Sequence, residues 1–265
     1  MHCGGRFLHV DLLGQKSHFS GSDRSYPKWA LAGPGNYGLD LQSVLAYIGS
    51  MGHVDSDPSL SASVKPSRIV DALRIVCERN GHCRLRDGTD VCLRLIEPAD
   101  IPMCSAMLSE CSPKSLYSRY ERVVNEPPSG LASRLCCPDL RTELTVVAEV
   151  CVDGSPLMIG VAQLLADPSH EAAEYAVLVA DPWQSKGLGS AFTDCCLQLA
   201  HAWGIGRVVV ECLPGNMRII RILEKRAFDM YRNMQEHVVS GQKLIVDGHS
   251  DCLLGAPPAP GEKTK

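Results

Sequence analysis

Residues 181–190 read DPWQSKGLGS and place a glutamine, a lysine and two glycines in one short stretch. An apolar run at 174–180 precedes this stretch, and a helical pattern begins at Leu188. A turn between a strand and a helix leaves backbone N–H groups free and exposes the positive end of the helix dipole. Gly187 and Gly189 would let the backbone approach an anion closely. The stretch therefore predicts a phosphate-binding turn.

Two common nucleotide-binding turns do not fit these residues. A P-loop places lysine and then serine or threonine after its second glycine, but here Lys186 precedes Gly187 and Leu188 follows it. A dinucleotide-binding turn needs a small residue at the sixth position, where GLGSAF has Phe192. The remaining pattern is Gln-x-x-Gly-x-Gly. Taken alone, it is also compatible with a turn that binds nothing.

This pattern resembles the coenzyme A signature of the GNAT acetyltransferase superfamily. Residues 85–235 as a whole are similar to Pat-type bacterial protein lysine acetyltransferases. The segments that carry the similarity are LRDGTDVCLRLIEPADIP, SPKSLYSRY, VVAEV, GVAQLLADP, AEYAVLVADPWQSKGLG and ECLPGNMRIIRILEKRAF. The resemblance implies an α/β (α+β) GNAT fold, with helices around a mixed sheet of about six or seven strands. It also implies acetyl-CoA as cosubstrate and no metal.

The resemblance assigns binding roles to two groups of residues. The backbone of Leu178, Val179 and Ala180 would hold the pantetheine arm and the acetyl carbonyl. Gln184 would head a pyrophosphate cradle that consists of Ser185, Lys186, Gly187, Leu188, Gly189 and Ser190. Asn216 would bond the pantetheine arm, or cap the following helix, or do both. Lys186 either adds charge near the phosphates or is a solvated lysine.

Glu174 is the candidate general base. Period-two alternation places it on one face of a strand with Ala176 and Leu178. Small apolar neighbours disfavour the charged form of a carboxylate, which suits proton abstraction from an amine. Pat-type enzymes carry their glutamate base at the matching position. The alternative is a solvated strand end, and the nearby Glu171 is typical of turn chemistry.

Other positions depart from the family pattern or are open to two interpretations. Leu223 stands where many GNAT enzymes have a tyrosine acid, so no general acid is assigned. Ala227 stands where the family prefers glycine, although alanine tolerates a left-handed helix end poorly. Ser115, Tyr117 and Arg119 either line the approach of the acceptor or belong to an ordinary helix face.

Local patterns divide the chain into three parts. Residues 1–84 predict an irregular extension with short helices at 39–52 and 66–81, and 251–265 predict a disordered tail. Residues 85–250 predict the acetyltransferase domain. Its expected elements are a strand at 91–96, a helix after Glu97, a helix capped by Ser112, a hairpin turning at Asp153-Gly154, a helix from Leu188 to Gly204, a strand at 207–213, a helix with Ile219, Ile220, Leu223 and Ala227 on one face, and two final strands in 228–248.

Composition narrows the function classes. A net charge of −4 gives no support to a nucleic-acid partner. No apolar stretch approaches the roughly 20 residues of a membrane helix, and the N-terminus lacks a signal-peptide core, so we expect a cytoplasmic protein without membrane contact. The 13 cysteines form no CxxC pair, which favours core packing over zinc.

The expected activity is acetyl transfer from acetyl-CoA to an amine, most simply a lysine of a protein substrate. Two alternatives stay open: acetylation of a small amine such as a polyamine or an antibiotic, and an inactive acyl-CoA-binding regulatory module. A small-molecule enzyme would be expected to have a closed, acidic acceptor pocket. The sequence leaves the acceptor, the acyl chain and the oligomeric state undetermined.

Overall fold

The computed structural model describes residues 72, 81–120 and 131–245. The predicted helix at 39–52 and the predicted tail at 251–265 lie outside them, as does the predicted helix segment at 66–81 apart from Ala72 and Gly81. The strands are β1 (His82–Arg84), β2 (Asp90–Leu95), β3 (Glu143–Val152), β4 (Ser155–Ala166), β5 (Ala172–Val179), β6 (Arg207–Cys212), β7 (Asp229–Asn233) and β8 (Val238–Leu244). The α-helices are α3 (Ile101–Ser109), α4 (Pro113–Tyr120), α5 (Leu131–Cys136), α6 (Leu188–Trp203) and α7 (Met217–Glu224). Short 3-10 helices, η2 (Pro98–Asp100) and η3 (Asp181–Trp183), precede α3 and α6.

The strands form one sheet in the order β1-β2-β3-β4-β5-β6-β8-β7. Every neighbouring pair is antiparallel except β5 and β6, which are parallel. The predicted mixed α/β sheet is thus confirmed, with eight strands rather than six or seven. The additional strand, β1, begins at His82 and is too short to leave a periodic signal in the sequence.

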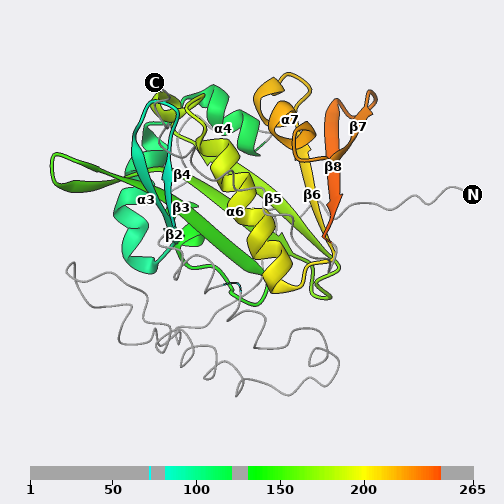
Figure 1. Cartoon of the computed structure of the whole chain (residues 1–265), viewed down its shortest axis with the longest axis horizontal. Helices are drawn as coiled ribbons and strands as arrows, with labels where there is room; N and C mark the ends of the chain where they lie inside the picture. The colour runs from blue at the N-terminus through cyan, green and yellow to red at the C-terminus, as the bar shows by residue number, and fades with distance from the viewer. Residues whose placement is uncertain (1–71, 73–80, 121–130, 246–265) are drawn as a thin grey trace, which may run out of the picture.

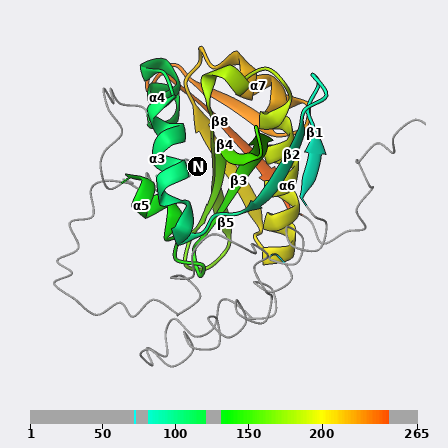
Figure 2. The same ribbon diagram turned by 90° about the vertical axis from the view of Figure 1, so that its left-hand side faces the viewer.

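Helices cover both faces of the sheet (Figure 1). Turned by 90°, the molecule shows α6 on one side of the strands and α3, α4 and α5 on the other (Figure 2). The α6 face is filled by a large apolar cluster that includes Tyr175, Phe192 and Trp203. The opposite face is filled by a second cluster, in which Leu178 and Ala180 of the β5 end pack with residues of α3 and α5. Adjacent residues of β5 therefore serve different cores, as the alternation predicted.

Helix α6 confirms its sequence pattern most fully. It begins after Gly187, with φ 106°, and ends at Gly204, with φ 82°, so left-handed glycines bound it at both ends. Phe192, Leu199 and Trp203 are at most 1 % exposed. Burying each such side chain contributes about 1.5–3 kcal/mol to folding. The helix is therefore firmly anchored, and its N-terminus is held in place at the end of β5.

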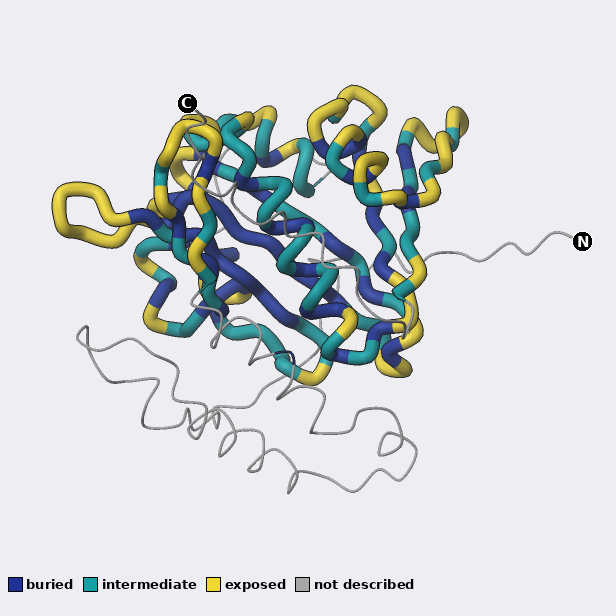
Figure 3. The backbone as a smooth tube through the Cα atoms, in the orientation of Figure 1, coloured by how far each residue is buried: buried dark blue, intermediate teal, exposed yellow. Residues whose placement is uncertain are grey.

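The β3–β4 hairpin turns at Asp153 and Gly154, with φ values of 50° and 79°, as the sequence predicted. Figure 3 shows its exposed tip extending from a largely buried sheet. Lower in the hairpin, Ala148 pairs with Gly160 but Glu149 pairs with Met158, so Ile159 is an extra residue in β4. Such a bulge bends its strand and changes the direction of the side chains that follow.

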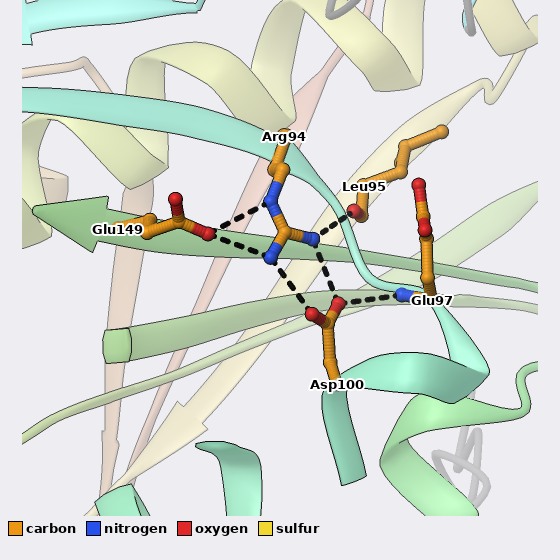
Figure 4. Close-up of polar contacts among 5 residues, drawn as sticks. All are labelled: Arg94, Leu95, Glu97, Asp100 and Glu149. Carbon is orange, nitrogen blue, oxygen red and sulfur yellow. Dashed lines mark hydrogen bonds and ion pairs between the residues drawn. The ribbon is translucent and has the colours of Figure 1, made fainter. Parts of the chain in front are cut away.

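Arg94 of β2 connects the sheet to the start of α3 (Figure 4). Its guanidinium donates to both oxygens of Asp100, at 2.7 and 2.8 Å, and to Glu149 Oε2, at 2.7 and 3.1 Å. Asp100 is only 4 % exposed and also accepts from the Glu97 N–H. Burial disfavours the charged guanidinium, but hydrogen bonds to Asp100 and Glu149 outweigh this and raise the pKa of Arg94 further.

Removing Asp100 should destabilise the domain strongly, because Arg94 would keep a half-buried charge with one partner fewer. We expect Asp100→Ala to lower the free energy of unfolding by about 3–5 kcal/mol. Asp90→Ala is the matched control, since Asp90 pairs with Arg84 where both side chains are 72 % exposed. The control variant should lower the free energy of unfolding by less than about 1 kcal/mol. Urea unfolding followed by circular dichroism measures both, and equal losses would contradict the assignment.

The prediction for the end of α7 was partly wrong. Ile219, Ile220 and Leu223 share the buried face as expected, but Ala227 lies beyond the helix and is exposed. Its φ of 54° is left-handed, and its N–H donates to the Glu224 carbonyl at 3.1 Å. The chain thus keeps, with alanine, a conformation that glycine adopts at lower cost.

Replacing Ala227 with glycine should stabilise the domain, because it removes the steric cost of the left-handed conformation. We expect Ala227→Gly to raise the free energy of unfolding by about 1 kcal/mol. Ala106→Gly provides a control of opposite sign, because Ala106 is exposed within α3. Glycine there should lower the free energy of unfolding by about 1 kcal/mol. Thermal melting of both variants tests the pair, and destabilisation by Ala227→Gly would refute the interpretation.

Candidate functional site

A cleft with a volume of about 1000 Å³ opens where β5 and β6 separate. The two strands pair only at Ala172, Ala173 and Glu174 with residues 207–209 in the described ladder. Beyond that point β5 continues to pair with β4 on its other edge. The cleft is lined by the end of β5, the segment after β6, the N-terminus of α6 and parts of α4 and α7.

The separation leaves backbone groups of β5 directed into the cleft. Ala180 N–H donates to Ile159 of β4 at 3.0 Å, so alternation turns the peptide groups of Val177 and Val179 toward β6. Both residues line the cleft, as does Leu178 between them. Of the three residues predicted to contribute backbone groups here, Val179 therefore has the matching orientation. Ala180 bonds β4 and is not among the lining residues.

The turn before α6 presents unused N–H groups. Within the described part of the chain, none of the backbone N–H groups from Ser185 to Gly189 has a hydrogen-bond acceptor, and the first bonded ones are Ser190 and Ala191, which donate to the Gly187 carbonyl. Ser185 and Gly187 have φ values of 64° and 106°, which orients successive peptides toward one side. Gly189 lies so close to α7 that a Cβ there would be 3.2 Å from Ile222. Bulkier residues would therefore disturb this turn.

The β1–β2 turn braces the same segment from outside. The Arg86 N–H donates to the Lys186 carbonyl at 2.9 Å, and the Arg86 side chain lies beside Gly187. The Lys186 ammonium bonds Asp87 at 3.0 Å and lies 4.5 Å from the Trp183 ring centre, which holds it outside the cleft lining. Its hydrogen bond lowers the pKa of Asp87 to about 2. Arg86, not Lys186, is thus the cation that lines the cleft at this turn.

The Gln184 carboxamide connects three walls of the cleft. Its Nε2 donates to Val179 O at 3.0 Å and to Ser115 Oγ of α4 at 2.9 Å. Its Oε1 accepts from Arg218 of α7, which reaches across from the opposite wall. Both ends of the side chain are therefore engaged, so Gln184 does more than shape the turn.

Asp181 fixes α4 to the end of β5. Its carboxylate accepts from the Ser112 N–H at 2.9 Å, from Ser112 Oγ at 2.7 Å and from Ser115 Oγ at 3.1 Å. Burial alone would raise the pKa of Asp181, but the donors from Ser112 and Ser115 outweigh it and hold the pKa below its usual value. Ser112 also accepts from the Ser115 N–H at 3.3 Å, which confirms its predicted role as the helix cap.

The cleft carries a clear excess of positive charge. Its cationic lining residues are Arg86, Lys114, Arg119, Arg218, Arg221 and Lys225. Asp181 is the one acidic residue among the lining residues, and its carboxylate is already engaged by Ser112 and Ser115. On α7, the cations at 218, 221 and 225 lie opposite the buried Ile219–Ile220 side of the helix. The arrangement suits an anionic ligand.

Glu174 occupies the last parallel ladder pair, opposite Val209, where β5 and β6 begin to separate. It is half-buried and is not among the residues that line the cleft. Val177, the innermost lining residue of β5, is three residues further along, or about 10 Å. Glu171, the competing candidate, is exposed in the turn before β5, close to Asp167 and His170.

Asn216 and Leu223 lie on different sides of α7. Asn216 occupies the N-cap position without capping through its side chain, and it lines the cleft. Leu223 is completely buried in the α6-side core. Tyr117, on the α4 wall, is the one tyrosine among the residues that line the cleft.

The structure thus brings most of the predicted residues together at one cleft. The lining includes Leu178, Val179, Gln184, Ser185, Gly187, Gly189, Ser190 and Asn216 from the predicted set. Lys186, Leu188 and Ala180 contribute no lining surface, and Leu188 is buried in the core. Sequence reasoning missed Val177, Arg86 and the α7 cations. The spacing of Arg218, Arg221 and Lys225 opposite the apolar face would have revealed the α7 group.

Comparison with known proteins agrees with this geometry. Residues 112–228 match the Acetyltransferase (GNAT) family. The match spans less than half of the chain, which is thus similar to this family over that segment. The GNAT domain of S. lividans PAT superposes with a TM-score of 0.55 at 23% identity, over 62% of this chain and 95% of that chain, and supports the GNAT fold.

Two further structures are similar at lower TM-scores. Spermidine N-acetyltransferase from Vibrio cholerae, in complex with CoA and spermine, has a TM-score of 0.49 at 15% identity, covering 58% of this chain and 95% of that chain. The cAMP-binding acyltransferase from Mycobacterium smegmatis has a TM-score of 0.43 at 19% identity, covering 67% of this chain and 51% of that chain.

Metal and membrane features are not found where the structure can be described. Over residues 72, 81–120 and 131–245, no group of three or more His, Cys, Asp or Glu side chains is arranged to hold a metal ion. No helix within these same ranges is both long enough and apolar enough to cross a bilayer. Cys196 and Cys212 are buried in the α6-side core, which agrees with the expected core packing, whereas Cys92 and Cys195 in similar apolar segments are only partly buried.

The Asp181 contacts should make stability depend on pH. The pKa of Asp181 in the folded state lies below the unfolded value of about 3.9. The stability that its contacts contribute is therefore present above about pH 4 and is lost as pH falls through the folded pKa. We expect Asp181→Asn to cost about 1 kcal/mol at pH 7 and progressively less below pH 4. Urea unfolding across this range measures it, with the exposed Asp229→Asn as control. A cost independent of pH would contradict the role.

Proposed function

We propose that this protein transfers the acetyl group of acetyl-CoA directly to the side-chain amine of a lysine in a protein substrate. The observation that carries the proposal is the separation of β5 from β6, which opens a cationic cleft ending at a turn with unused N–H groups. The match of residues 112–228 to the GNAT acetyltransferase family supports the same chemistry.

The residues present fit the anionic part of acetyl-CoA. The N–H groups from Ser185 to Gly189 would hold the diphosphate at the N-terminus of α6, where the helix dipole also favours negative charge. Arg86 on one side of the turn and Arg218, Arg221 and Lys225 on α7 would supply balancing charge. When bound, acetyl-CoA would provide the activated acetyl group as a thioester.

The residues between the turn and Glu174 fit the pantetheine arm. Val177 and Val179 direct peptide groups into the cleft, so an extended amide-containing chain could pair with β5 where β6 has separated. The Asn216 side chain, which makes no capping bond, lies on the opposite wall. Gln184 and Arg218, which meet across the cleft, would have to adjust to admit the ligand.

Glu174 would remove the proton from the acceptor. A lysine amine has a pKa near 10.4 and is mostly protonated at neutral pH, so attack requires a base. Glu174 lies about three residues deeper along β5 than the cleft lining, and we infer that a bound water conveys the proton. Leu223 is buried in the core, so the helix supplies no tyrosine acid there. A thiolate, with a usual pKa near 8.5, can leave without one.

The charge of the cleft favours a protein lysine over a polyamine. A polyamine carries several positive charges, and its binding site would need carboxylates to balance them. Among the described lining residues, Asp181 alone is acidic, and its oxygens are engaged by serine donors. The open cleft also differs from the closed acidic pocket expected of a small-amine enzyme.

Glu174→Gln tests the proposed activity and the base together. We expect kcat for acetylation of a lysine peptide to fall by about 10²–10⁴-fold, because general base catalysis typically contributes that much. The KM for acetyl-CoA should change less than about twofold, since Glu174 does not line the cleft. Thiol release and mass spectrometry of the peptide measure transfer, and isothermal titration measures acetyl-CoA binding.

Glu171→Gln is the matched control, because it removes a nearby carboxylate that is exposed in the turn. It should retain activity. A Glu174→Gln variant as active as the wild type would refute the base assignment, and a wild type that binds no acetyl-CoA would refute the proposed function.

A further inference from the structure

Arg119 is a half-buried cation on the α4 wall of the cleft. Its Nη2 donates to Gln163 Oε1 of β4 at 2.6 Å, and its guanidinium lies 4.9 Å from the ring centre of Tyr120. Gln163 is buried and donates in turn to Thr145 Oγ1 at 3.3 Å. The arginine is therefore anchored to the sheet through an uncharged amide.

This environment differs from that of the other enclosed arginines. Arg94 is held by Asp100 and Glu149, and Arg226 forms a two-pronged contact with Asp194 at 2.6 Å. No carboxylate in the described residues forms an ion pair with Arg119, and its Nε and Nη1 have no acceptor there. A half-buried charge without a counter-charge is costly. Such a group is well suited to an anion that arrives with a ligand.

Arg119 is anchored close to the candidate base. Gln163 pairs with Ala176 across the β4–β5 ladder, and Leu165 pairs with Glu174. Residues two apart on a strand share a face, so the partner of Arg119 and the Glu174 side chain lie on the same side of the sheet, one pair apart. The guanidinium thus contacts the sheet one ladder pair from Glu174, the residue beside which the proposed function places the amine.

The other cations of the cleft have a separate position. Arg86 lies at the phosphate-binding turn, and Arg218, Arg221 and Lys225 extend from α7 on the opposite wall. These four would balance the phosphates of acetyl-CoA. Arg119 on α4 and the more exposed Lys114 are not needed to balance these phosphates.

We propose that the acceptor lysine lies beside a carboxylate, and that Arg119 binds this carboxylate and thereby determines acceptor specificity. The inference rests on the proposed acetyl transfer to a lysine. A guanidinium offers parallel N–H donors that match both oxygens of a carboxylate, and such charge-assisted pairs are among the stronger hydrogen bonds. The carboxylate comes either from an Asp or Glu next to the lysine or from a free amino acid.

The test is a set of otherwise identical peptides with one central lysine, flanked by Asp and Glu, by Ser and Ala, or by Lys and Arg. Two small molecules complete the set. Free lysine has a carboxylate near its side-chain amine, and Nα-acetyl-lysine amide has the same amine but no carboxylate. Rates of CoA release at saturating acetyl-CoA give kcat/KM for each acceptor. The wild type should prefer the acidic peptide over the basic one by about tenfold or more, the effect of one charged hydrogen bond.

Variants identify the residue responsible. Arg119→Gln should abolish the preference, Arg119→Lys should keep part of it, and Arg119→Glu should reverse it. Arg84→Gln is the control, because Arg84 is an exposed arginine that pairs with Asp90 outside the cleft, and it should behave as the wild type. Titration of acetyl-CoA should give the same affinity for Arg119→Gln as for the wild type. This readout separates loss of acceptor binding from loss of folding.

Each outcome decides the inference. Equal rates for the wild type on acidic and basic peptides, or an unchanged preference in Arg119→Gln, would overturn the role of Arg119 and leave the proposed function standing. Transfer to free lysine but to no peptide would overturn the proposed protein substrate and leave the carboxylate requirement standing, and transfer to no acceptor would overturn both. Because the peptide series uses the wild type, the result does not depend on the stability of any variant.

Discussion

The site depends on one constraint: β5 and β6 pair in parallel at residues 172–174 and then separate. The strands cannot close again, because β5 is paired with β4 from Ala173 to Val179 and β6 is paired with β8. Backbone groups near the end of β5 are therefore without a strand partner, which in a packed interior would be costly. A ligand that supplies amide groups would remove that cost, which is why we propose the gap in the sheet as the binding site.

The elements around this gap are held by polar contacts rather than by apolar packing alone. Asp181 and Gln184 connect β5 and α4, and the Arg94 group connects β2, β3 and the segment leading into α3. Such contacts have directional geometry, which fixes positions within the range that catalysis requires. The apolar clusters on both faces supply the bulk of the stability, and the polar contacts set the orientation of the walls.

Elements with long periodic patterns could be predicted from the sequence, and contacts between distant segments could not. Helix α6, its glycine ends and the Asp153-Gly154 hairpin follow from local rules that the sequence carries in full. Arg86 contributes to the cleft because a short turn happens to lie against Gly187, and no local pattern contains that contact. Periodicity places Ala227 on a helix face, but α7 ends at Glu224 and Ala227 adopts a left-handed φ, because apolar spacing does not mark the residue at which a helix stops. The role of Gln184 depends on Ser115 and Arg218, which are remote in sequence.

Charge divides the cleft into two functional halves. The α7 wall and the turn beside Gly187 carry cations that line the same cleft as the segment with unused N–H groups, so both would contribute to binding one anionic ligand portion. The α4 wall carries Arg119, whose anchor lies on the strand next to Glu174. A base that must accept a proton works against a nearby cation, since positive charge favours its ionised form. An acceptor carboxylate that neutralises the guanidinium would relieve this effect when the amine is in place, and the base would then bind the proton more readily. Acceptor recognition and proton removal would in this way be coupled through one residue.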